Sequence, residues 1–528
     1  MRPRSVVTMA LGLCLALLAA AAPASLAGQE VAEQDAAAID RRPIEDPLFG
    51  VSSVVPEDWR DLGSGTYARG TPPQDLALVA IQTAPASLEQ LWPSLLPQFA
   101  LDEIPEVTGT ISAAGFDWQL YQFVVGLGDT TLAVELAMAE DDGATHLVLL
   151  QSEPGEFAVL REQVLLPAIE AFGILAPEPT PDPATLGFAV EEVAFPGGSD
   201  GVELAGTLTL PPGPGPHPAI VLMSGSGAQD RDESLRPIST IKPFALIADA
   251  LTSAGVAVLR YDDRGVGAST GDYDGATVTT LAGDGHAALE YLRDRTDVDP
   301  TRIGILGHSE GGLYAAMLAA EDSGIAFVVG MAAPAVDGVD LIVSQNEAIA
   351  QAAGETEEEI ALIMAFAEEA VPLARDGEAK ALGASIRDYF GALWDRQSED
   401  DRTVLGDRDT FAQRQVDNLL SAYLSDWYRS ILAYDPAPDW ERVRAPVLGL
   451  FGARDVQVVL DRNEPALRAA LEAAGSDFEI VVFPDANHLF QAAETGGLDE
   501  YSTLAPRFTA GFLPTLVDWV TAQAGVAG

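Results

Sequence analysis

The chain has 528 residues, more than one ordinary domain needs, so two domains with separate hydrophobic cores are expected. Its composition is strongly acidic: 80 Asp and Glu residues stand against 29 Lys and Arg residues, a formal net charge of −51. Such a surface repels nucleic acid and anionic membranes, which argues against both as partners. The charge favours solubility and carries no information about chemistry.

The N-terminus has the pattern of a secretory signal. The positively charged start Met1–Arg4 precedes the apolar run Val6–Ala22, and Ser25-Leu26-Ala27 places small residues where signal peptidase cleaves. Residues 1–27 are therefore predicted to be a cleaved signal peptide, and we expect a secreted or periplasmic protein. The apolar run is short for a membrane span, and no later run is long enough to be one. The only cysteine, Cys14, lies inside this signal, so no disulfide is expected after cleavage. A lipoprotein anchor at that cysteine fits less well, because a bulky leucine precedes it.

The first domain is predicted to span residues 48–175, after a flexible tether at 28–47. Apolar runs of strand type and segments with helical periodicity indicate a small α+β unit. The predicted strands are Leu76–Ile81 and Thr145–Leu150, and the predicted helices are Leu88–Phe99 and Phe157–Phe172. The region resembles the Mog1/PsbP-like fold in having Pro56-x-x-Trp59 near its start and a closing helix that ends in Ala171-Phe172. It shows no catalytic constellation.

A proline-rich stretch, residues 176–187, is predicted to be a semi-rigid linker to a second domain at 188–528. In that domain short apolar strands alternate with helical segments, which is typical of a sheet with parallel crossovers. The predicted strands are Gly206–Leu210, Ala219–Met223, Ala257–Tyr261, Ile303–Leu306, Phe327–Met331, Val447–Phe451 and Glu479–Phe483. A helical insertion rich in aromatic residues, at about 337–440, is predicted to be a lid over the carboxyl edge of this sheet. For any one of its aromatic residues, packing between the helices is an equally good explanation.

The pentapeptide Gly307-His308-Ser309-Glu310-Gly311 fits a nucleophilic serine on a sharp strand-to-helix turn. The apolar run Arg302–Leu306 before it is typical of a buried strand, and Gly312–Ala320 after it is a good helix former. A serine held in poor backbone geometry needs small neighbours, and the two outer glycines meet that need. Ser309 is therefore predicted to be a nucleophile, and a structural serine in a βα turn is the plain alternative.

A serine hydroxyl needs a base within hydrogen-bond reach, and the chain has five histidines. Position sets four of them aside: His146, His217, His286 and His308, the last because the elbow should turn its side chain away from the nucleophile. His488 remains, directly after the last predicted strand. Asp455 follows the strand Val447–Phe451 and is predicted to orient His488, in the chain order serine, aspartate, histidine. Asp461 is the nearest rival, but it falls at a helix start, where it could act as an N-cap.

Acyl transfer also needs backbone donors for the developing oxyanion. One is predicted to be the amide of Glu310, directly after the nucleophile. The second is expected in the loop Ser224-Gly225-Ser226-Gly227, where we favour the Ser226 amide, with that of Gly227 next. A plain glycine turn is the alternative for this loop. The clusters Gln229–Asp232 and Asp262–Arg264 follow adjacent strands and predict an Arg–carboxylate network that braces the loops rather than a catalytic role.

From about Phe188 to the C-terminus, the chain resembles secreted or periplasmic α/β-hydrolases of the group that contains serine aminopeptidase-like and dienelactone hydrolase-like esterases. The motifs that carry this resemblance are Gly225-Ser226-Gly227-Ala228-Gln229-Asp230-Arg231-Asp232, Arg260-Tyr261-Asp262-Asp263-Arg264-Gly265-Val266-Gly267-Ala268-Ser269, Gly307-His308-Ser309-Glu310-Gly311-Gly312, Asn487-His488-Leu489-Phe490 and Asp499-Glu500-Tyr501. The resemblance implies an α/β-hydrolase fold, a Ser309 nucleophile, a His488 base and an Asp455 orienter. It also implies activity on small acyl esters. Where many relatives have histidine before the first oxyanion-loop glycine, this chain has Ser224.

The sequence therefore predicts an α/β-hydrolase fold with a helical lid, preceded by a small α+β domain. The predicted function is a serine hydrolase that cleaves small-molecule carboxylic esters through an acyl-enzyme, with no cofactor and no metal. A serine peptidase of the aminopeptidase type or a thioesterase could use the same triad, and a non-catalytic binding protein is a further alternative.

Overall fold

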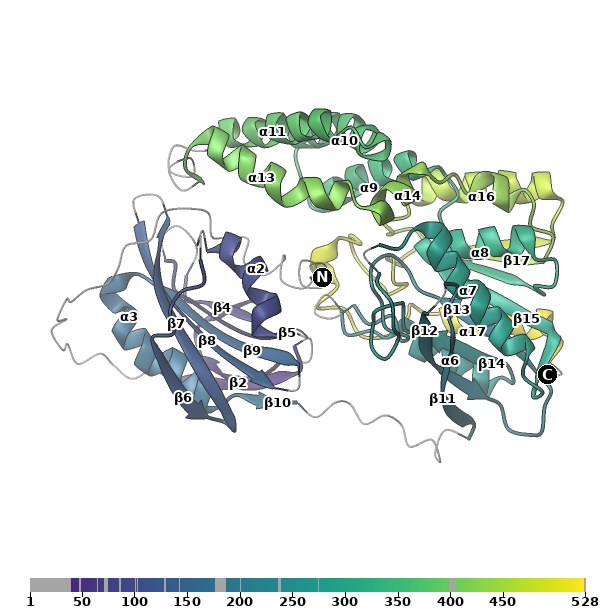
Figure 1. Ribbon diagram of the computed structural model, residues 1–528, viewed down its shortest axis with the longest axis horizontal. Coiled ribbons are helices and arrows are strands. Elements are labelled where there is room, and N and C mark those ends of the chain that lie inside the picture. Colours follow the sequence, from purple (N-terminus) through teal and green to yellow (C-terminus); the bar gives the residue numbers. More distant parts are fainter. Residues whose placement is uncertain are drawn as a thin grey trace. The chain divides into compact units, whose positions relative to one another are not determined.

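The computed structural model describes residues 39–526 apart from 47–48, 64, 71–74, 85–86, 100, 102, 128–129, 142, 176–186, 200, 236–238, 274, 398–401 and 403–404. The predicted signal peptide at 1–27 and nearly all of the predicted linker lie outside these residues. The chain forms two compact units (Figure 1). Unit 1 takes in the described residues up to 175 and those within 390–415, and unit 2 takes in the remainder from residue 187 onward. Among the described residues, no helix combines the length and the apolar character that a membrane crossing requires.

Unit 1 is built on antiparallel sheets. In the described part of this unit, a seven-stranded sheet has the order β3-β4-β5-β9-β8-β7-β6, and a three-stranded sheet has the order β1-β2-β10. The strands of the larger sheet are β3 (Arg60–Gly63), β4 (Thr66–Ala68), β5 (Leu78–Ala84), β6 (Gly109–Ala113), β7 (Phe116–Leu127), β8 (Thr130–Asp141) and β9 (Ala144–Ser152). The strands of the smaller sheet are β1 (Arg41–Asp46), β2 (Val51–Pro56) and β10 (Gly173–Ile174).

The predicted tether at 28–47 is wrong at its end. Residues Arg41–Asp46 form β1, which pairs with β2 in antiparallel register along its whole length. The physical reason is that the apolar side chain of Ile44 packs into the hydrophobic core of unit 1. A charged stretch thus becomes a strand because one of its residues is covered.

Both faces of the larger sheet are covered. Consecutive residues of β9 alternate between two cores, with Leu147 and Leu149 in one and Val148 and Leu150 in the other. The first core includes side chains of helix α2 (Leu88–Gln98). The second includes those of α3 (Pro154–Leu160), a π-helical turn (Arg161–Leu165) and α4 (Leu166–Glu170). Because both faces are apolar, β9 reads in the sequence as a continuous hydrophobic run.

Unit 2 contains a mostly parallel sheet, with the order β11-β12-β14-β13-β15-β16-β17-β18 within the described residues. Strand β12 is antiparallel to both of its neighbours, and from β14 to β18 adjacent strands run parallel. The strands are β11 (Ala189–Pro196), β12 (Glu203–Leu210), β13 (His217–Met223), β14 (Ala257–Tyr261), β15 (Val298–His308), β16 (Val328–Met331), β17 (Val447–Gly452) and β18 (Phe478–Phe483). The carboxyl ends of the parallel strands share one edge, where ligand sites of such sheets form.

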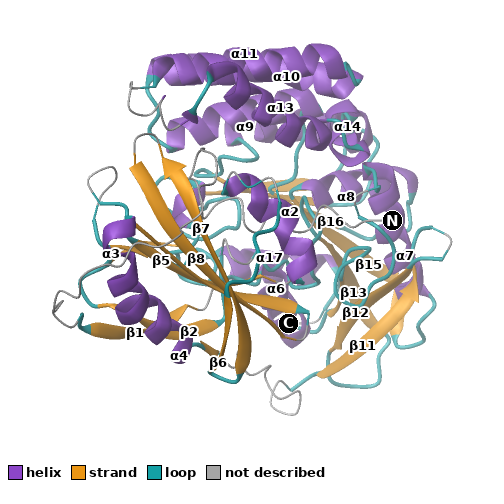
Figure 2. Ribbon diagram, turned by 60° about the vertical axis from the view of Figure 1, so that its left-hand side comes forward, coloured by secondary structure: helices purple, strands orange, loops and turns teal. Residues whose placement is uncertain are grey.

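Helices cover this sheet on both faces (Figures 1 and 2). Helices α6 and α17 pack together on one side, whereas α7 and α8 pack together on the other. Their bounds are α6 (Pro243–Ser253), α7 (Val278–Arg293), α8 (Glu310–Glu321) and α17 (Phe512–Gln523), and α16 (Leu460–Ala474) lies against β17. A single 3-10 turn, Leu498–Glu500, lies between β18 and α17 in the described chain.

The insertion between β16 and β17 is helical, as the sequence predicts. Its helices are α9 (Gly338–Ala352), α10 (Glu357–Asp376), α11 (Ala379–Arg396), α13 (Arg408–Tyr423), α14 (Asp426–Ala433) and α15 (Ala437–Trp440). Helix α10 begins with a capping box, in which Thr356 and Glu359 exchange hydrogen bonds. Helices α9, α10 and α14 contact one another, and α14 also contacts α7. The fold prediction is thus confirmed: a mostly parallel sheet flanked by helices, with a helical insertion, follows a small α+β domain.

Candidate active site

Ser309 occupies a strained turn between β15 and α8. Its backbone has φ 52° and ψ −121°, a conformation that residues with a side chain rarely adopt. The flanking glycines are required, because a Cβ at Gly307 would lie 2.1 Å from the Gly311 carbonyl oxygen, and a Cβ at Gly311 would lie 2.2 Å from that of Met223. Ser309 itself is partly exposed, whereas both of its neighbours are buried. The turn therefore presents the hydroxyl at the carboxyl edge of the sheet.

Asp455 and His488 meet in the loops after β17 and β18. The Asp455 Oδ2 atom lies 2.9 Å from His488 Nδ1, and both side chains are buried. The other carboxylate oxygen of Asp455 accepts the amides of Gln457 at 2.8 Å and Val458 at 2.9 Å. Because the carboxylate can only accept, His488 donates from Nδ1 and keeps Nε2 as an acceptor. The rival, Asp461, lies exposed in the first turn of α16.

His308, which sequence reasoning set aside, links the nucleophile's turn to the loop of His488. Its Nε2 atom lies 2.9 Å from the His488 carbonyl oxygen, and its Nδ1 atom lies 2.7 Å from Glu233 Oε1. The centroids of the two imidazole rings are 4.8 Å apart. Ser309, directly after His308, is thereby held in the same cluster as Asp455 and His488. Glu233 is not among the predicted site residues because it lies one residue beyond Gly225–Asp232, the motif that carries the family resemblance.

The loop Ser224–Gly227 lies against the nucleophile, since a Cβ placed on Gly225 would come 3.1 Å from Ser309 Cβ. Two of its amides are engaged: Gly225 donates to Glu233 Oε1 at 2.9 Å, and Gly227 donates to the Tyr273 hydroxyl at 3.0 Å. The Ser226 amide between them donates to no acceptor in the part of the chain that the structure describes. The amide of Glu310, the first residue of α8, has no partner within its own helix. These are the two predicted oxyanion donors.

The side chain of Glu310 is buried beside the elbow and bound to the insertion. Its Oε1 accepts the Tyr314 hydroxyl at 2.5 Å, and both of its oxygens lie 3.2 Å from the indole nitrogen of Trp427 on α14. Burial raises the pKa of Glu310 from 4.5 to about 7, although the hydrogen bonds from Tyr314, Ser226 and Trp427 lower it. Trp427 is thus an aromatic residue of the insertion that reaches the site, where its indole contacts the carboxyl group next to the nucleophile.

The predicted Arg–carboxylate network is present. Arg231 makes a bidentate contact to Asp262, with nitrogen–oxygen distances of 3.0 and 2.7 Å. Burial alone would raise the pKa of Asp262, but the hydrogen bonds from Arg231 hold it below its usual value. In a second, buried pair Arg264 makes two contacts of 2.7 Å to Asp284 on α7. These pairs fix the loops that follow β13 and β14.

Asp263 holds the oxyanion loop, Ser224–Gly227, by hydrogen bonds. It accepts the hydroxyl of Ser224 at 3.0 Å and the amide of Gln229 at 3.0 Å. Burial raises the pKa of Asp263 well above its usual range. Ser224, which stands where many relatives have histidine, thus holds the loop through a direct hydrogen bond to this carboxyl group.

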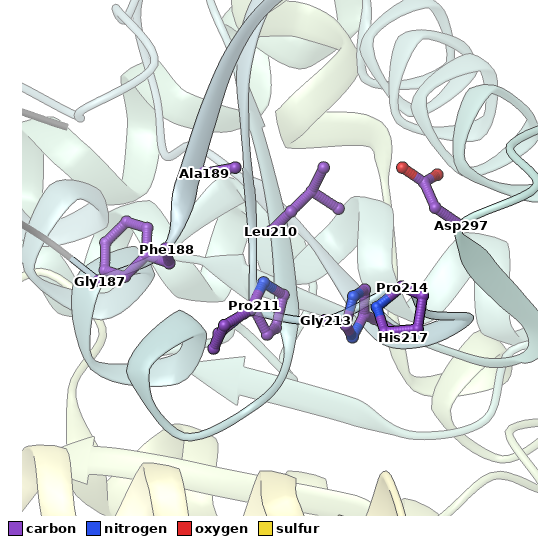
Figure 3. A pocket seen from close by; sticks show the side chains of 10 residues that line it. Gly187, Phe188, Ala189, Leu210, Pro211, Gly213, Pro214, His217 and Asp297 are labelled. Carbon is purple, nitrogen blue, oxygen red and sulfur yellow. The ribbon is translucent and has the colours of Figure 1, made fainter. Parts of the chain in front are cut away.

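A cavity of about 510 Å³ lies elsewhere in unit 2 (Figure 3). Its lining residues are Gly187, Phe188, Ala189, Leu210, Pro211, Pro212, Gly213, Pro214, His217 and Asp297. His217 is the first residue of β13, whereas Ser224–Gly227 follow the last residue of the same strand. The cavity is therefore at the amino end of the sheet, opposite the edge that carries Ser309, and takes no part in this site.

The chain is similar to several known proteins. A family model described as X-Pro dipeptidyl-peptidase (S15 family) matches residues 200–489. The esterase EstD of Thermotoga maritima is 25% identical over 423 residues, which cover 79% of this chain and 82% of that protein. Among solved structures, the esterase Pf2001 of Pyrococcus furiosus has 16% identity and a TM-score of 0.36, over 65% of this chain and 95% of that chain. The α/β-hydrolase GrgF of Penicillium sp. sh18 has 16% identity and a TM-score of 0.38, over 64% of this chain and 99% of that chain.

Proposed function

Since the chain belongs to the X-Pro dipeptidyl-peptidase (S15) family and is a serine hydrolase of the α/β-hydrolase superfamily, we propose that it cleaves carboxylic esters of small acyl groups through an acyl-enzyme. The nucleophile is Ser309, the base is His488 and the orienting carboxylate is Asp455. The observation that carries this proposal is the buried hydrogen bond between Asp455 and His488, because it holds the imidazole in the tautomer that accepts a proton at Nε2.

The proposed reaction has two halves. In the first, Ser309 Oγ attacks the ester carbonyl carbon while His488 Nε2 accepts the hydroxyl proton. The resulting tetrahedral oxyanion accepts hydrogen bonds from the backbone amides of Ser226 and Glu310. The C–O bond to the leaving group then breaks as His488 returns the proton to the alcohol. In the second half, water attacks the acyl-enzyme by the same steps and releases the carboxylic acid. Asp455 stays ionised throughout and stabilises the imidazolium.

The test uses a fluorophosphonate probe and p-nitrophenyl esters of increasing acyl length. We expect Ser309→Ala and His488→Ala to lower kcat by about 10⁶-fold, and Asp455→Asn by about 10⁴-fold. Asp461→Asn is the matched control, because this carboxylate is exposed on α16 and should leave turnover unchanged. Probe labelling should disappear in Ser309→Ala, slow strongly in Asp455→Asn and stay unchanged in Asp461→Asn. Full esterase activity in Ser309→Ala protein would refute the proposal.

A serine peptidase is the second candidate, because the matched family is described as X-Pro dipeptidyl-peptidase. An enzyme that binds a free peptide amine needs an accessible carboxylate near the nucleophile. Glu310 is the nearest acid in sequence, but it is buried and already accepts the Tyr314 hydroxyl and the Trp427 indole, so we favour esters. Assaying Xaa-Pro p-nitroanilides beside p-nitrophenyl esters separates the two. A kcat/KM for the anilides above that for every ester would establish the peptidase instead.

A further inference from the structure

Glu233 holds two parts of the site with a single oxygen atom. Its Oε1 accepts the amide of Gly225 at 2.9 Å and lies 2.7 Å from His308 Nδ1. The side chain is almost fully buried, and its backbone has φ 58°, a strained conformation for a residue other than glycine. Its second oxygen, Oε2, is buried and has no hydrogen-bond partner among the described residues. A buried carboxylate that is kept in a strained conformation indicates a specific partner, and here that partner is His308.

The protons of His308 follow from its two contacts. The Nε2 atom faces the His488 carbonyl oxygen at 2.9 Å, and because a carbonyl only accepts, Nε2 must carry a hydrogen. The Nδ1 atom faces Glu233 Oε1, which also accepts the Gly225 amide. An ionised Glu233 offers only acceptors, so opposite it Nδ1 carries a hydrogen as well. A ring with hydrogens on both nitrogens is an imidazolium. With Glu233 ionised, His308 and Glu233 form a buried ion pair.

We propose that Glu233 keeps His308 as an imidazolium whose two N–H groups fix the oxyanion loop and the loop of the catalytic base in one register. The inference rests on the proposed function, since it assigns positioning roles around Ser309 and His488. Glu233 and His308 do not touch the reacting atoms. They set the distance between Ser226, next to Gly225, and His488, and so align the oxyanion donors with the base.

The surroundings of His308 agree with a positive charge. The titratable groups that face it are Glu233, the Asp455 carboxylate and the ring of His488. Burial acts to lower the pKa of His308, but the charge of Glu233, its hydrogen bond, the His488 carbonyl and the charge of Asp455 together raise it. The charges of Glu233 and Asp455 thus both favour the charged form of His308.

The sharpest variant is Glu233→Gln. An amide oxygen can replace Oε1 and accept both N–H groups only while His308 stays protonated. Once His308 loses a proton, either Nδ1 or Nε2 is bare. The contact to residue 233 or the contact to the His488 carbonyl is then lost, or the glutamine turns its NH2 group to Nδ1 and loses the hydrogen bond from the Gly225 amide. We expect kcat/KM of Glu233→Gln to be about 10-fold below that of the wild type at pH 8, with the loss mainly in kcat. This ratio should shrink toward unity as the pH falls to 5, because His308 is protonated again.

A double-mutant cycle tests whether the two residues act as one. His308→Ala should lower kcat/KM by itself, and adding Glu233→Gln to it should then change kcat/KM by less than about 3-fold, because the amide still accepts the Gly225 amide. Glu290→Gln, at an exposed carboxylate on α7, is the matched control and should behave as the wild type at each pH. A loss in Glu233→Gln that is equal at every pH, or effects that multiply in the double variant, would overturn the proposal.

A measurement on the wild-type chain tests the charge of His308 even if the variants fold poorly. With ¹⁵N-labelled histidine, the spectrum at pH 8 should contain one imidazole with hydrogens on both nitrogens, and its signal should be absent in His308→Ala. A neutral His308 at pH 8 would contradict the ion pair. Ser309→Ala tests the proposed function separately from the roles of Glu233 and His308. If that variant keeps its esterase activity, the proposed function fails, whatever the Glu233 and His308 variants show.

Discussion

Replacing Glu310 with glutamine should make the stability of unit 2 less sensitive to pH. The carboxyl group is buried at the start of α8, where burial raises its pKa from 4.5 to about 7. Glutamine has nearly the same shape as the protonated acid and can keep the hydrogen bond from Tyr314. The variant therefore removes the charge of the residue with little change in packing.

The expected magnitude follows from the pKa difference between the folded and unfolded chain. Below pH 4.5 the group is protonated in both states, so its full contribution to stability is present there. Between pH 4.5 and about 7 the unfolded chain gives up the proton while the folded chain keeps it, and stability falls by about 1.4 kcal/mol per pH unit. The loss is complete above about pH 7 and amounts to about 3 kcal/mol. Glu310→Gln lacks this loss.

The assay is urea unfolding of the wild type and the variant at half-unit steps from pH 4.5 to 8.5, fitted for the transition of unit 2. The difference in unfolding free energy, variant minus wild type, should rise by about 3 kcal/mol across this range and level off above pH 7.5. Glu321→Gln, an exposed residue at the other end of α8, is the control and should show no such rise. A difference for Glu310→Gln that is flat with pH would show that the carboxyl group titrates normally, and the account of its burial would be wrong.

Two further substitutions test the packing around the site. Gly311→Ala places a Cβ 2.2 Å from the Met223 carbonyl oxygen, so the turn that holds Ser309 must shift, and kcat should fall by about 100-fold or more. Gly383→Ala is the control: its Cβ would make an ordinary 3.5 Å contact, and esterase kinetics should stay unchanged. Arg264→Met leaves Asp284 buried without its arginine partner and should lower the free energy of unfolding, measured in urea, by about 3–5 kcal/mol. The double variant Arg264→Met, Asp284→Leu should recover most of this loss. An equal loss in both variants would contradict the ion-pair explanation.

Much of the fold of unit 2 could be predicted because most of its parallel strands are buried on both faces. Residues Val447–Phe451 form a short continuous apolar run, and the structure extends it only to Gly452 in β17. Strand β11 (Ala189–Pro196) was missed because it is an antiparallel edge strand with mixed exposure and two adjacent glutamates. In unit 1 the long strands β7 and β8 were missed for a related reason: polar residues such as Gln119, Gln122 and Glu135 interrupt their apolar pattern.

The candidate site was predictable where chemistry demands a residue type at a fixed position along the chain. Ser309 follows a buried strand, and His488 remains after four other histidines are set aside by position. Glu233 and His308 could not be found in this way, because their roles depend on contacts across 75 and 180 residues of sequence. The available signal was the acid directly after Gln229–Asp232, in a loop that already contained the predicted oxyanion donor.

The acidic composition of the chain hides the acids that matter to the site. With 80 aspartates and glutamates in the sequence, the number of acids does not single out any one carboxylate. Glu233, Asp263, Glu310 and Asp455 differ from surface acids because each is buried and accepts hydrogen bonds from groups around Ser309. Burying a carboxylate is costly unless donors replace its water, so each buried acid fixes the position of the groups that donate to it. In this protein the loops at the carboxyl edge of the sheet are therefore held in place by buried acids, and a substitution that removes a donor should disturb the site more than one that removes a surface charge.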